Sequence, residues 1–254
     1  PWAYLAGEVT LSESELQLLR GLYRAGGAYV DEQLAALRAA LRAAGELADT
    51  VFVVTADHGE NVGDHGMLDH QYCLYDTLVH VPLVLSGGGF AGGDDLTGLV
   101  SLVDLAPTLL DEAGIEAPAA RESFQGVSVH PEGDSDPRAF VVSEYAEPQP
   151  SMAALERTLG ELPAHVREYD RSLRAIRTAS HKLVRGSDGA RALYDLAADP
   201  GETTDVSAER PSVADDLAAR LDDWLASFEH ADADGPVDIS AAREERLEQL
   251  GYLQ

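Results

Sequence analysis

The chain has 254 residues, enough to bury one large domain or one domain with a small appendage. Its 45 acidic and 18 basic side chains give a formal net charge of −27, which disfavours binding to nucleic acid or anionic membranes, because basic side chains bind both. A single cysteine excludes an internal disulfide framework, and no apolar run reaches the about 18 residues that a membrane span requires.

The basic residues are almost all arginine, and Lys182 is the only lysine. An acid excess with arginine in place of lysine is typical of proteins that work in concentrated salt, where hydrated carboxylates keep the surface soluble. The Debye length falls to roughly 3 Å at 1 M salt, so this charge need not repel an anionic substrate there. We therefore expect a halophilic protein from the cytoplasm of a high-salt organism; an acidic mesophilic protein is the alternative.

A long helix is predicted near the start of the chain. Ser12 and Glu15 form a capping box ahead of apolar residues at helical spacing, and the pattern ends at Gly45. The β-branched run 51–55 follows directly and is typical of a strand buried on both faces of a mainly parallel sheet. A helix that feeds a parallel-type strand is half of a crossover unit, so the predicted fold class is α/β.

A loop rich in acids and histidines follows this strand, at the end of the sheet where α/β proteins bind ligands. Carboxylates and imidazoles together suit a divalent cation, and interspersed glycines let the backbone turn around it. A solvated acidic loop is the alternative. The candidate ligands are Asp57, His58, Glu60, Asp64, His65, Asp69 and His70.

Further elements are predicted in order along the chain. A second strand covers 80–85, and a helix over 102–113 has Pro107 in its first turn and Gly114 at its stop. A short strand is expected at 140–143. The pattern weakens around 145–170, where we place the boundary between a domain of residues 1–150 and one of residues 151–254.

The second domain is predicted to be a small antiparallel sheet with a packing helix. Three short apolar segments, 173–178, 181–185 and 191–194, are separated by turn-forming residues. A helix with one apolar face starts at Ser212, and a final short helix is expected at about 240–250. This makes the smaller domain α+β.

A series of motifs follows in order along the chain. The first, the run TADHGENVGDHG followed by HVPLVL, resembles the strand-to-loop signature of the sulfatase family of the alkaline phosphatase superfamily. Similar blocks follow in the same order over nearly the whole chain: SLVDLAPTLLDEAGI, FQGVSV, VVSEY, IRTASHKLV, LYDLAADPGE and LEQLGYL. The resemblance implies that residues 1–150 are the latter part of the catalytic α/β domain, a partial alkaline-phosphatase-like sheet flanked by helices.

The resemblance also implies roles in the loop. Asp57 and His58 match the second pair of metal ligands of the family; alternatively, His58 only orients Asp57. Calcium is the expected ion, with manganese or zinc as alternatives because calcium takes few nitrogen ligands. His70 lies where many relatives place a lysine that contacts the sulfate, so a protonated imidazole is expected to donate there or to the leaving oxygen. His65 is the second candidate for a catalytic histidine, or a bridge between carboxylates.

The implied function is hydrolysis of a small-molecule or carbohydrate sulfate ester. Family members carry a formylglycine nucleophile in an early (C/S)-x-P-x-R motif, which is absent here, and Cys73 has no proline or arginine at the required offsets. We therefore expect the carboxyl-terminal portion of such an enzyme, inactive without the missing amino-terminal half of the same protein. A phosphodiesterase or phosphonate monoester hydrolase of the superfamily, or a non-catalytic metal-binding remnant, are the alternatives.

Overall fold

The structure is a computed structural model that describes residues 1–90, 93, 97–133, 138–228 and 246. The chain divides into two compact units, residues 1–219 and residues 220–254. All of the strands described below lie in the first unit. In the part of the chain that the structure describes, no helix is long and apolar enough to cross a membrane.

The predicted long helix is α2 (Glu13–Ala44), which follows the short helix α1 (Trp2–Leu5). The capping box forms as predicted: the backbone N–H of Glu15 donates to Ser12 Oγ at 3.3 Å, and that of Ser12 donates to the Glu15 carboxylate at 2.7 Å. Gly45 ends the helix with a left-handed φ of 82°. A 3₁₀ turn, η1 (Leu47–Asp49), then leads into strand β1 (Phe52–Thr55).

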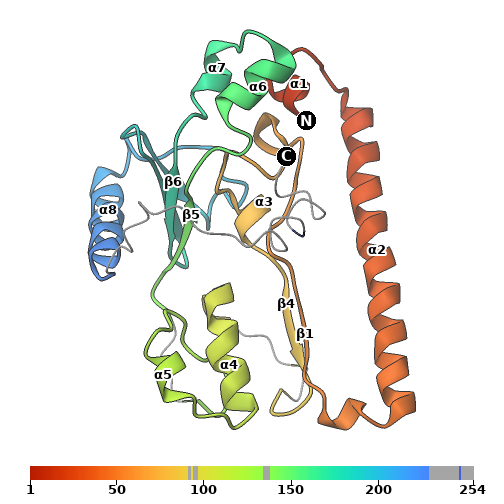
Figure 1. Cartoon of the computed structure of the whole chain (residues 1–254). Coiled ribbons are helices and arrows are strands. Elements are labelled where there is room, and N and C mark those ends of the chain that lie inside the picture. Colours follow the sequence, from red (N-terminus) through yellow and green to blue (C-terminus); the bar gives the residue numbers. More distant parts are fainter. Residues whose placement is uncertain (91–92, 94–96, 134–137, 229–245, 247–254) are drawn as a thin grey trace. The chain divides into compact units, whose positions relative to one another are not determined.

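Strand β1 pairs with β4 (Leu83–Ser86) in antiparallel register, with Thr55 opposite Leu83 (Figure 1). The predicted parallel arrangement is therefore wrong for this pair, and the residues of β1 are half-buried or exposed rather than buried on both faces. Parallel neighbours need a crossover, usually a helix of several turns. The connection holds only the four-residue helix α3 (Asp76–Val79) and a small hairpin, so the chain returns along β1 in the opposite direction.

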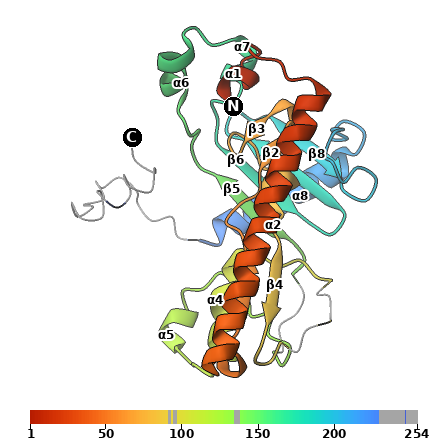
Figure 2. The same ribbon diagram turned by 90° about the vertical axis from the view of Figure 1, so that its right-hand side faces the viewer.

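The small hairpin consists of strands β2 (Asn61–Val62) and β3 (Leu68–Asp69), whose labels lie together in Figure 2. A 3₁₀ turn, η2 (Asp64–Gly66), joins the two strands. Asn61 lies opposite Asp69 across the pair. The hairpin thus folds the acid- and histidine-rich loop back on itself.

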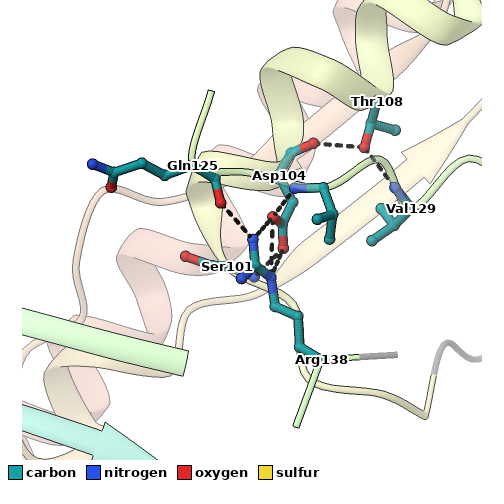
Figure 3. Close-up of polar contacts among 7 residues, drawn as sticks. Ser101, Asp104, Thr108, Gln125, Val129 and Arg138 are labelled. Atoms are coloured by element: carbon teal, nitrogen blue, oxygen red, sulfur yellow. Dashed lines mark hydrogen bonds and ion pairs between the residues drawn. The ribbon is translucent and has the colours of Figure 1, made fainter. Parts of the chain in front are cut away.

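The predicted helix over 102–113 begins with the 3₁₀ turn η3 (Leu102–Asp104) and continues as α4 (Leu105–Glu112), before the short helix α5 (Pro118–Arg121). Asp104 at the start is fully buried. Its carboxylate accepts hydrogen bonds from Ser101 N and Val127 N, both at 2.8 Å, and pairs with the guanidinium of Arg138. Figure 3 shows how this network connects the start of the helix to segment 124–129.

Thr108 makes a second buried link in the same network. Its Oγ donates to the Asp104 carbonyl at 2.6 Å and accepts from Val129 N at 2.9 Å (Figure 3). We expect Thr108→Val to lower the free energy of unfolding by about 1–3 kcal/mol, because it keeps the shape but leaves the Val129 N–H without its acceptor. Urea unfolding followed by circular dichroism measures this. The exposed Thr158→Val is the control, and equal losses in the two variants would contradict the prediction.

The predicted antiparallel sheet is confirmed and has four strands in sequential order: β5 (Val141–Tyr145), β6 (Leu173–Arg177), β7 (His181–Gly186) and β8 (Arg191–Asp195). Helices α6 (Met152–Leu159) and α7 (Ala164–Arg167) lie between the first two strands in the sequence. Because β5 pairs with β6, residues from both sides of position 150 share this sheet. The division into domains 1–150 and 151–254 stays a prediction.

The helix predicted from Ser212 is α8 (Pro211–Ala226). Ala214 and Leu217 on its apolar face are buried, as the periodicity predicts. Apart from Arg246, the helix predicted at about 240–250 lies outside the described residues, as does the block LEQLGYL.

Two of the family-like blocks meet Asp76 of α3 at a buried group of charges. Lys182 of β7, 1 % exposed, has its Nζ 2.8 Å from Glu202 Oε1 and 2.9 Å from Asp76 Oδ1, while Arg177 Nε lies 3.3 Å from Asp76 Oδ2. Burial raises the pKa of Asp76, but Lys182 and Arg177 outweigh it and hold that pKa below its usual value. LYDLAADPGE, which ends at Glu202, therefore connects the small sheet to α3.

The acidic composition predicts that the thermal stability of the protein depends on salt concentration. With a net charge of −27, repulsion between like charges opposes compaction in dilute buffer and is screened at molar salt. We expect the melting temperature to rise between roughly 0.1 and 2 M potassium chloride. A scan by circular dichroism measures it, and a flat or falling curve would contradict a halophilic protein.

Candidate functional site

The loop after β1 is held close to helix α3. Gly59 N donates to the carbonyl of Leu78 at 2.8 Å. A Cβ at Gly59 would lie 2.0 Å from the carbonyl oxygen of Thr77, so only glycine allows this approach. The chain bends at Asp57, just after β1, and packs closely against α3 at Gly59.

Asp57 and His58 lie close together at this bend. His58 N donates to Asp57 Oδ1 at 3.0 Å, and His58 Nε2 lies 3.9 Å from the same oxygen. His58 Nδ1 lies 2.8 Å from the Gly59 carbonyl, which can only accept, so in the neutral ring Nδ1 carries the proton and Nε2 has the lone pair. The side chains are 80 % and 44 % exposed, so a carboxylate oxygen and an imidazole nitrogen are both accessible.

A second group of donors lies on the hairpin. His70 Nδ1 is 2.7 Å from Asp69 Oδ1 and 3.3 Å from Glu60 Oε2. One donor atom from each of the three residues lies within 4.8 Å of the others, a spacing that could hold a metal ion. Glu60 and Asp69 were predicted only as members of the ligand-rich loop, without individual roles. The signal was the pair of glycines, Gly63 and Gly66, which turn the chain so that these residues meet.

The two groups touch through their histidines. The rings of His58 and His70 stack with centroids 4.2 Å apart and planes inclined by 27°. The structure therefore gathers five side chains into one candidate site: Asp57, His58, Glu60, Asp69 and His70.

His65, the second predicted catalytic histidine, makes different contacts. It has a left-handed φ of 53°, and its ring stacks on Tyr75 with centroids 3.5 Å apart. Burial lowers the pKa of His65, although the nearby carboxylates of Glu202 and Asp64 oppose the shift. His65 is thus placed toward the buried ion pairs, and it is absent from both donor groups described above.

Cys73 is buried, as expected for a small apolar side chain rather than a nucleophile. The amide of Asn61 donates to its sulfur at 3.4 Å. Burial raises the pKa of the thiol, which keeps it protonated and unreactive.

Sequence comparisons place this chain among known proteins. The profile of the family described as Sulfatase matches residues 10–115. The chain is 32 % identical to arylsulfatase K of Bos taurus over 213 residues, which are 83 % of this chain and 37 % of that protein. It is 30 % identical to arylsulfatase K of Homo sapiens with the same coverage. The chain thus spans only a little over a third of the length of these relatives.

Solved structures show the same partial coverage. The phosphonate monoester hydrolase of Agrobacterium radiobacter superposes with a TM-score of 0.69 and 29 % identity, over 85 % of this chain and 43 % of that chain. A 2-O GAG sulfatase superposes with a TM-score of 0.64 and 26 % identity, over 78 % and 41 %. These likenesses confirm the predicted fold class.

Proposed function

The chain belongs to the sulfatase family, and from this premise we propose that the intact protein hydrolyses sulfate esters of a small molecule or carbohydrate. One observation carries the proposal: Asp57 and His58 converge directly after β1, in the stretch that matches the family profile. The chain spans about 37 % of the curated relatives, so the activity is proposed for the intact protein and not for this chain alone.

Asp57 and His58 are the proposed ligands of a divalent ion. Their accessible oxygen and nitrogen are 3.9 Å apart, a separation that suits two ligands of one ion with bonds of about 2.0–2.6 Å. Calcium is the proposed ion, with manganese or zinc as alternatives because of the imidazole ligand. Such an ion supplies Lewis-acid polarisation of the sulfuryl group and stabilises the charge that develops on its oxygens.

His70 is the proposed hydrogen-bond donor to the ester. Its Nδ1 contacts two carboxylates, Asp69 and Glu60, which leaves Nε2 for a sulfuryl oxygen or the leaving oxygen. Those carboxylates and the stacked ring of His58 fix the orientation of the imidazole. His65 has the weaker claim because its ring is stacked on Tyr75.

We propose that the nucleophile comes from an amino-terminal half of the same protein. The α2 helix supports this, since large apolar side chains on it are exposed, including Leu18 at 65 %, Leu22 at 62 % and Tyr29 at 63 %. Exposed apolar surface of this kind marks a packing interface. Among the described residues, β1 and β4 form a two-stranded sheet, which is marginally stable by itself and needs further packing.

The proposal predicts that the purified 254-residue chain does not hydrolyse an aryl sulfate, whereas the intact protein does so and loses the activity when a chelator is added. A spectrophotometric assay of both proteins at high salt measures this. Turnover by the chain alone would contradict the proposed source of the nucleophile. An inactive intact protein would favour a non-catalytic metal-binding remnant.

A phosphonate monoester hydrolase is the second candidate function, because the solved structure of such an enzyme has a TM-score of 0.69 with this chain. Both reactions need a metal and hydrogen-bond donors around an anionic ester. Values of kcat/KM for an aryl sulfate and an aryl phosphonate, measured on the same preparation, decide between the two functions.

A further inference from the structure

Glu60 and Asp69 form an unusual pair of facing carboxylates. Among the residues that the structure describes, their only basic partner is the imidazole of His70, whose Nδ1 lies 3.3 and 2.7 Å from them. Their side chains are only 28 % and 22 % exposed, so water screens the two charges in part. The buried carboxylate of Asp104, by contrast, is paired with a guanidinium. The hairpin therefore carries negative charge that a cation would balance.

We propose that Glu60, Asp69 and His70 bind a divalent cation of their own, in addition to the ion proposed at Asp57 and His58. The donor atoms lie within 4.8 Å of one another. Ligand bonds of about 2.1 Å place donors on opposite sides of an ion about 4.2 Å apart, so small side-chain rotations complete the set. Two carboxylates with one imidazole suit Mn²⁺ or Zn²⁺ better than an all-oxygen calcium site, and water completes the coordination.

This assignment is compatible with a hydrogen bond from His70 to an ester. Coordination through Nδ1, the nitrogen that faces both carboxylates, leaves the ring proton on Nε2. Nε2–H then donates to an anionic oxygen, and the bound cation brings positive charge next to the ring. The ring of His58 stacked on that of His70 limits its rotation. The inference itself rests on the donor geometry and not on which ester is cleaved.

The test is calorimetric titration of the 254-residue chain with Mn²⁺, and separately with Zn²⁺, in about 2 M potassium chloride to suppress diffuse binding to the acidic surface. We expect a saturable binding step that Asp69→Asn and His70→Gln each weaken by at least about 10-fold, whether or not a second ion binds at Asp57 and His58. The exposed variants Asp170→Asn and His80→Gln are matched controls that remove the same groups elsewhere, and both should bind as the parent chain does. Asp57→Asn should also leave this site intact.

A spectroscopic readout identifies the ligand directly. Electron spin echo measurements on the Mn²⁺ complex should show nitrogen coupling that His70→Gln removes and His80→Gln preserves. Circular dichroism of each variant confirms folding, and Glu60→Gln provides a further ligand variant if Asp69→Asn does not fold.

Three results would overturn the inference: no saturable binding of either ion, equal weakening in ligand and control variants, or loss of binding in Asp57→Asn but not in Asp69→Asn. The titration uses no ester and no upstream sequence. Its failure is therefore distinguishable from failure of the proposed sulfate ester hydrolysis.

Discussion

Replacing Lys182 by methionine should destabilise the protein by about 3–5 kcal/mol, the cost of removing one partner from a buried ion pair. The ammonium group lies within 2.9 Å of both Glu202 and Asp76, and Glu202 is only 2 % exposed. Methionine fills a similar volume but leaves the buried Glu202 carboxylate without its cation and Asp76 with Arg177 alone. Urea unfolding at high salt, followed by circular dichroism, gives the change in the free energy of unfolding.

The matched control is Arg174→Met, which breaks an ion pair with Glu144 at 2.8 Å on the surface of the same sheet. Both side chains of that pair are more than 40 % exposed, so its loss should cost less than about 1 kcal/mol. A double variant, Lys182→Met with Glu202→Gln, should recover part of the loss because it removes one uncompensated charge. Equal effects of the two single variants would show that burial does not set the strength of the Lys182 group.

In the intact protein, Asp57→Ala should lower kcat/KM for an aryl sulfate by roughly 1,000-fold. A catalytic metal contributes several kcal/mol to transition-state stabilisation, and each 1.4 kcal/mol is about tenfold in rate. The melting temperature should stay within about 2 °C, because the side chain is 80 % exposed and an exposed substitution rarely alters stability by more. Steady-state kinetics and a thermal scan of the same preparation measure both quantities.

His58→Ala separates two roles for the histidine. If His58 is a ligand, the loss should match that of Asp57→Ala; if it only orients Asp57, the loss should be about 10- to 100-fold. The exposed Asp49→Ala serves as the control for removal of a carboxylate and should retain full activity. Full activity of Asp57→Ala would refute the metal-ligand assignment.

Local signals predicted much of the fold. The capping box at Ser12 and the alternation in 173–194 depend on neighbouring residues, so α2 and the antiparallel sheet were predictable. The direction of pairing between β1 and β4 was not, because it depends on how the intervening segment folds. The ion pair between Lys182 and Asp76 could not be predicted either, because the two residues are 106 positions apart in the sequence.

Only part of the candidate site was predictable from the sequence. Asp57 and His58 are adjacent in one motif, so both could be predicted as site residues from the sequence. Glu60 and Asp69 meet only through the register of a hairpin with two-residue strands, in which Asn61 lies opposite Asp69. The left-handed backbone at His65 turns that ring onto Tyr75, which no periodic pattern encodes.

The burial of Lys182 also determines how readily a lysine-specific protease cleaves the chain. It is the only lysine, so an endoproteinase that cuts after lysine has one side chain to recognise, and that side chain is 1 % exposed within strand β7. Cleavage requires local unfolding of β7 from the sheet, and it yields fragments 1–182 and 183–254. When opening and closing are fast relative to cleavage, the cutting rate reports the equilibrium population of the open form. A single protease band can therefore monitor the opening of the small sheet.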